Sequence, residues 1–148
     1  MVLTDTDTAT VPRAVEISFR LWLLAVAAGL FETVLVVTDG LVEHTLSGGA
    51  IVSGAGVRLV VFAVALVLAF RMRAGSRAAS LALTVLLGVL GLASLLVGPL
   101  EWLADGAPDP HLRPVEWVFA GSRVVHVAAV LGAVAAMYAA RARRWFRG

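Results

Sequence analysis

The chain alternates four long apolar stretches with short polar segments. The apolar stretches cover about residues 17–37, 51–70, 78–103 and 115–140. A helix of about 20 apolar residues crosses a hydrocarbon core of about 30 Å, because each residue adds about 1.5 Å. The pattern therefore predicts an all-α membrane protein in which four transmembrane helices form one domain over residues 13–140.

Polar segments flank this domain at both ends. Residues 1–12 are rich in Thr and Asp and show no apolar period, so we expect a disordered tail. They lack the basic start and the cleavage site of a secretory signal, and the first span is therefore expected to be retained. Residues 141–148 carry four arginines and are expected to form a basic tail.

The composition agrees with a membrane protein. Hydrophobic residues make up 60% of the chain and charged residues 15%, with a mean hydropathy of +0.93. Soluble domains average about 45–50% apolar residues and about 25% charged residues. The absence of cysteine excludes disulfides and thiolate metal sites. The pI near 10.4 is high, but the arginines flank apolar spans and therefore indicate topology, so we expect no nucleic-acid partner.

The arginines are unevenly distributed between the loops. Three lie in the loop after the second stretch and four in the C-terminal tail, but the first loop has none and the third has only Arg113. By the positive-inside rule, both termini are expected to be cytoplasmic and the acidic loops to lie outside. We expect tryptophans at both interfaces: Trp102 and Trp117 outside, Trp22 and Trp145 inside.

A short motif occurs twice. Residues 29–32 read Gly-Leu-Phe-Glu and residues 98–101 read Gly-Pro-Leu-Glu; residues 55–58 read Ala-Gly-Val-Arg and residues 120–123 read Ala-Gly-Ser-Arg. The charges match in order and at similar spacing. This internal repeat suggests two duplicated helical hairpins, related by an axis along the membrane normal.

Ionisable side chains inside apolar spans mark the candidate site. They are Glu32, Arg58, Glu101, Glu116, Arg123 and His126. Glu32, Arg58 and Arg123 are each expected about 10 Å below the outer interface at about 1.5 Å per residue. Glu116, Arg123 and His126 share one helix face. An Arg near the bilayer centre costs at least about 2.5–3.5 kcal/mol, so this face should turn away from lipid.

Two interpretations of this cluster remain open. In the first, Glu32 pairs with Arg58, and Glu101 or Glu116 pairs with Arg123, so that the charges fasten the helices. The protein would then be a non-enzymatic accessory or assembly subunit that binds a second copy or another membrane protein, with the 78–103 helix as the docking face. This is the preferred hypothesis, because no catalytic motif is present.

The alternative is a transporter or ligand-binding subunit with an outward-facing polar pocket. Two guanidiniums suit a carboxylate or a phosphate, and a set of Glu, Arg and His could relay a proton. Ser53 and Ser122 lie near the arginines and are read as packing or hydrogen-bonding residues. We expect no cofactor and no metal, since only His126 lies within a span and a b-type haem needs two facing histidines.

Residues 12–22 read Pro-Arg-Ala-Val-Glu-Ile-Ser-Phe-Arg-Leu-Trp. This opening, together with the four spans, resembles small four-span membrane proteins of unknown function from actinobacteria. The resemblance implies an inner-membrane location and a high-GC Gram-positive source, in line with the use of arginine without lysine. It implies no catalytic residue.

Overall fold

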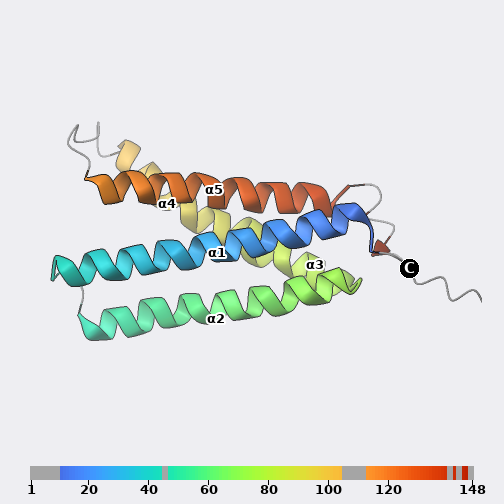
Figure 1. Ribbon diagram of the computed structural model, residues 1–148, viewed down its shortest axis with the longest axis horizontal. Coiled ribbons are helices and arrows are strands. Elements are labelled where there is room, and N and C mark those ends of the chain that lie inside the picture. Colours follow the sequence, from blue (N-terminus) through green and yellow to red (C-terminus); the bar gives the residue numbers. More distant parts are fainter. Residues whose placement is uncertain (1–10, 45–46, 105–112, 140–141, 143–144, 147–148) are drawn as a thin grey trace, which may run out of the picture.

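The computed structural model describes residues 11–44, 47–104, 113–139, 142 and 145–146 (Figure 1), without the side chains of residues 50, 97–99 and 101–103. The helices are α1 (Arg13–Val42), α2 (Gly48–Arg73), α3 (Arg77–Leu83), the π-helix η1 (Thr84–Gly91), α4 (Leu92–Ala104) and α5 (Pro114–Met137). The described part of the chain contains no strand.

The predicted all-α fold with four helices long and apolar enough to cross a membrane is confirmed. These segments are Arg13–Val42, Ile51–Arg73, Arg77–Leu96 and Pro114–Met137. The helices α1 and α2 extend beyond the predicted spans at both ends, and the third predicted span consists of α3, η1 and α4 in succession. The expected tail at residues 1–12 lies outside the described residues except for its last two, and most of the expected tail at residues 141–148 lies outside them as well.

Helix α1 is the central element. It packs against both α2 and α5, while the run from α3 to α4 crosses behind them (Figure 1). Its buried positions recur at helical spacing, from Val15 through Phe19, Trp22 and Ala25 to Glu32. This stripe follows the i, i+3, i+4, i+7 pattern of a helix face that packs against neighbours, which explains why α1 lies in the middle.

The tightly packed core lies at the end of the bundle where α1 begins and α2 and α5 finish, called here the Met72 end. Trp22, Met72, Leu83 and Met137 are among its largest fully buried side chains. Trp22 was expected at a membrane interface, but its side chain is completely buried, because its position on α1 faces the other helices. Trp117 was expected at the outer interface. Its side chain is 66% exposed, as expected of an aromatic residue that contacts lipid.

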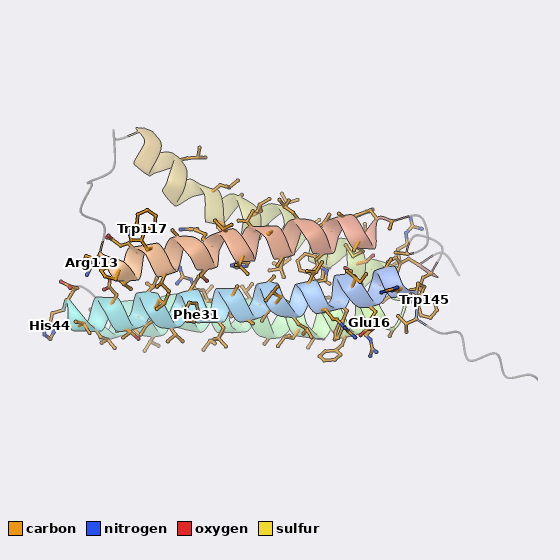
Figure 2. All side chains as sticks on the ribbon, turned by 45° about the horizontal axis from the view of Figure 1, so that its top comes forward. Glu16, Phe31, His44, Arg113, Trp117 and Trp145 are labelled. Atoms are coloured by element: carbon orange, nitrogen blue, oxygen red, sulfur yellow. The ribbon has the colours of Figure 1, made fainter. Side chains whose placement is uncertain are left out.

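Ion pairs hold α1 to its neighbours at both ends. At the Met72 end, Oε2 of Glu16 accepts a hydrogen bond of 2.8 Å from Nε of Arg73 on α2. At the opposite end, called the Arg113 end, Arg113 contacts Asp39 of α1 and Glu43, the residue that follows this helix. Figure 2 shows Glu16 and Arg113 at these two opposite ends of the molecule.

The middle of the third span is a π-helix over residues 84–91. Stretches of π-helix are uncommon, occur often at functional sites and are a known cause of helix kinks. After this segment, α4 diverges from α5 toward the Arg113 end (Figure 2). The two halves of the bundle therefore differ: the Met72 end is closely packed, and the Arg113 end is more open.

Candidate functional site

A partly enclosed cavity of about 320 Å³ lies between α1, α2, α5 and the π-helix with the start of α4. Its polar lining includes Glu32 from α1, Arg58 from α2, and Arg123 and His126 from α5. The structure thus brings four of the six predicted site residues, from three helices, to one cavity. Its volume is within the range of about 300–1,000 Å³ that small-molecule sites occupy.

Glu32 is the most buried ionisable group of this site, with 8% exposure. Its Oε1 lies 3.2 Å from Nδ1 of His126, a distance at which the ring N–H donates to the carboxylate. The hydroxyl of Ser122 donates to the same oxygen over 3.5 Å. The interpretation of Ser122 as a hydrogen-bonding residue is therefore confirmed, and this contact joins α5 to α1.

Arg123 is partly buried beside these groups. Its guanidinium carbon lies 5.3 Å from the centre of the Phe119 ring, a cation–π contact within the same helix. Its Nε is fully buried and has no hydrogen-bond partner among the described residues. An orphaned buried donor is unusual in a folded protein, because burial removes water without replacing its hydrogen bond.

Arg58 reaches the cavity from α2 with an exposed side chain. Within the part of the chain that the structure describes, neither Arg58 nor Arg123 forms an ion pair. Among the described residues, Arg123 and Arg58 therefore present two positive charges to the cavity, against the one carboxylate of Glu32.

Two of the expected ion pairs, Glu32 with Arg58 and Glu116 with Arg123, do not form. Glu32 pairs with His126 rather than with Arg58. Glu116 does not meet Arg123; its Oε2 accepts a hydrogen bond of 2.7 Å from the backbone N–H of Arg113, the residue that precedes α5. The helix start accounts for this, because the free N–H groups of the first turn attract a carboxylate. The Glu101 side chain lies outside the described residues.

Arg113 forms a second polar cluster at the edge of the bundle. Its Nη1 and Nη2 donate to the two carboxylate oxygens of Asp39 over 3.2 and 3.0 Å, and Nη1 also donates to Glu43 over 3.0 Å. The hydrogen bond to Asp39, reinforced by the nearby carboxylates, raises the pKa of Arg113 above its usual value. Sequence reasoning assigned Arg113 only to an outer loop, because a charge count does not show which charges meet.

Gly29 controls how closely the site residues approach α1. A Cβ atom at this position would lie 2.8 Å from Cζ of Phe62 and 3.1 Å from Cε1 of His126. The absence of a side chain therefore lets Phe62 and His126 pack against α1. The aromatic residues Phe62 and Phe119, which line the cavity, carry no sequence signal that separates them from other apolar residues of their spans.

No group of three or more His, Asp or Glu side chains that could hold a metal ion occurs among the described residues. Comparison with protein-family models, curated proteins and solved structures finds no match to this chain. The function is therefore inferred from the residues of this chain alone.

Proposed function

We propose that the protein is a non-enzymatic, multi-pass membrane protein that binds an anionic ligand in the cavity lined by Glu32, Arg58, Arg123 and His126. The observation that carries this proposal is the pair of arginines without an ion-pair partner in the described structure, both lining one cavity. Planar guanidiniums bind carboxylates and phosphates through paired N–H donors.

The geometry favours ligand binding over internal fastening. Charges that only fasten helices should neutralise one another, but Glu32, the one acid among the described residues that line the cavity, is engaged by His126 and Ser122. An unpaired Arg near the centre of a membrane span costs at least about 2.5–3.5 kcal/mol. A bound anion would offset that cost by pairing with the guanidiniums that line the cavity.

The orientation of the site follows from the distribution of arginines. We propose that the helices cross the bacterial cell membrane with both termini in the cytoplasm, since Arg71, Arg73 and Arg77 flank the loop at the Met72 end. The Arg113 end then faces outward, and the cavity is accessible from the outer half of the bilayer. The matching positions of Arg58 and Arg123 in the two hairpins are what a duplicated hairpin would produce.

A specific feature of α2 supports an additional role in assembly. The first half of α2 is exposed over most of its surface, and a Cβ atom at Gly54 or Gly56 would meet nothing within 4 Å. Small residues on an uncovered helix face allow another membrane helix to approach closely. A second copy or a partner protein packed on this face would also cover the exposed part of Arg58.

Native mass spectrometry of the full chain, extracted gently from its own membranes, tests ligand binding. We expect a bound anionic molecule on the wild-type protein, a strong loss of occupancy in Arg123→Gln and a partial loss in Arg58→Gln. Arg71→Gln is the matched control, because Arg71 is an exposed arginine of the same helix as Arg58 but lies outside the cavity.

Two results would contradict the proposal. One is a wild-type protein that carries no small molecule, and the other is equal occupancy in all four proteins. A defined homo-oligomer or a second protein without any small molecule would favour the assembly hypothesis instead.

A further inference from the structure

A second cavity of about 490 Å³, lined by apolar residues apart from Arg123, lies in the groove between α4 and α5. Its lining on α5 runs along one stripe, through Ala120, Val124, Val127, Ala128 and Leu131, and α4 contributes Leu95 and Leu96. The divergence of α4 from α5 opens this side of the bundle (Figure 2). In a bilayer, such an opening faces the acyl chains.

The polar and apolar cavities meet at two shared residues. Arg123 and Leu95 line both of them. Arg123 is therefore the charged boundary between a polar chamber, which contains Glu32, Arg58 and His126, and a groove whose other lining residues are all apolar. A ligand that fills both spaces needs an anionic head and an apolar chain.

We propose that the ligand of this site is a single-chain anionic lipid, whose carboxylate or phosphate head binds Arg123 and Arg58 and whose chain lies between α4 and α5. This inference rests on the proposed binding of an anion and adds the chemical class of the ligand. Charge complementarity sets the direction of the lipid, because Arg58 and Arg123 line the polar cavity and form no ion pair with the described residues.

The length and direction of the groove fit such a lipid. From Arg123 to Leu131 the stripe on α5 extends eight residues, or about 12 Å at about 1.5 Å per residue, toward the Met72 end. With the proposed orientation, the chain points to the bilayer centre and the head toward the outer surface. This is the direction that a lipid of the outer leaflet already has, so it can enter sideways between α4 and α5 without turning over.

A chain-length series tests the lipid hypothesis with the purified, delipidated full chain in detergent. Butyrate, decanoate, palmitate and palmitoyl-lysophosphatidate are titrated, and hexadecanol serves as the probe without a charge. We expect palmitate to bind more than about tenfold more tightly than butyrate, since each buried methylene adds roughly fourfold. Comparing palmitate with the lysophosphatidate then distinguishes a carboxylate head from a phosphate head.

A matched pair of variants separates the groove from general surface effects. Ala128→Trp places a large ring in the groove and should weaken palmitate binding by about tenfold or more while leaving butyrate binding unchanged. Ala63→Trp is the control, because Ala63 is an exposed alanine of α2 that lines neither cavity. It should leave both affinities unchanged.

The possible failures are distinguishable. If short and long carboxylates bind equally and Ala128→Trp has no effect, the lipid chain hypothesis is wrong, while anion binding stands. If hexadecanol binds as tightly as palmitate and Arg123→Gln changes neither, or if no anionic probe binds, anion binding itself is wrong. If the protein forms a dimer that Ala128→Trp dissociates, and palmitate does not compete, the groove binds a second copy and the lipid hypothesis is overturned.

Discussion

Glu32 and His126 lie 94 positions apart in the chain, yet Oε1 of Glu32 and Nδ1 of His126 are 3.2 Å apart in the structure. This contact joins the central helix α1 to α5 beside the two arginines of the cavity. It engages the one carboxylate that lines the cavity and so leaves Arg58 and Arg123 without an acid of their own in the described structure. The positive character of the site follows from this pairing.

Removing the Glu32 carboxylate should destabilise the protein. In Glu32→Ala, His126 and Ser122 lose their shared acceptor, and a buried group left without a partner costs about 1–3 kcal/mol. We expect a lower Tm in detergent for Glu32→Ala and a nearly unchanged Tm for Glu32→Gln, because the amide oxygen still accepts from both groups. Equal Tm values for Glu32→Ala and the wild type would show that the contact contributes nothing to stability.

Replacing Gly29, which lies against His126, with alanine should destabilise the protein. Gly29→Ala places a Cβ atom 2.8 Å from the Phe62 ring, so Phe62 and His126 must shift, and crowding of this kind typically costs about 1–3 kcal/mol. Gly121→Ala is the control, because its Cβ atom would lie in open space and alanine favours a helix over glycine. A Tm that falls equally in both variants, or in neither, would contradict a packing role for Gly29.

The Arg113 cluster should hold the ends of α1 and α5 together without contributing much to global stability, because exposed ion pairs are weak. In Arg113→Gln we expect faster hydrogen exchange in residues 36–42 and 114–119 and a nearly unchanged Tm. The charge swap of Arg113→Asp with Asp39→Arg should restore part of the protection that Arg113→Asp alone removes. Unchanged exchange in Arg113→Gln would rule out this role.

The proposed topology can be tested by cysteine labelling, since the chain has no native cysteine. Gly48 is the first residue of α2 at the Arg113 end, and Ala74 follows the last residue of α2 at the Met72 end; both positions are exposed. The variants Gly48→Cys and Ala74→Cys place one cysteine at each position. A membrane-impermeant maleimide should label Gly48→Cys in intact cells and Ala74→Cys only after permeabilisation. The opposite pattern would place the site in the cytoplasmic half of the bilayer.

Local rules were sufficient to predict the helices. Apolar length alone identified the four potential membrane spans, because a hydrocarbon core requires a certain length of helix whatever its neighbours are. The same reasoning identified Glu32, Arg58, Arg123 and His126 as candidates, because charges within an apolar helix are expensive and must avoid lipid. All four line the cavity.

Only the tertiary structure decided which charges meet and what surrounds them. Which charges pair depends on how the helices rotate and tilt against each other, and the period of a single helix does not determine this. Glu32 therefore contacts His126 rather than Arg58. Glu116 caps the start of its own helix at the backbone of Arg113. The burial of Trp22 has the same origin. The groove between α4 and α5 arises where α4 diverges beyond the π-helix, and no residue pattern in either helix predicts a space between them.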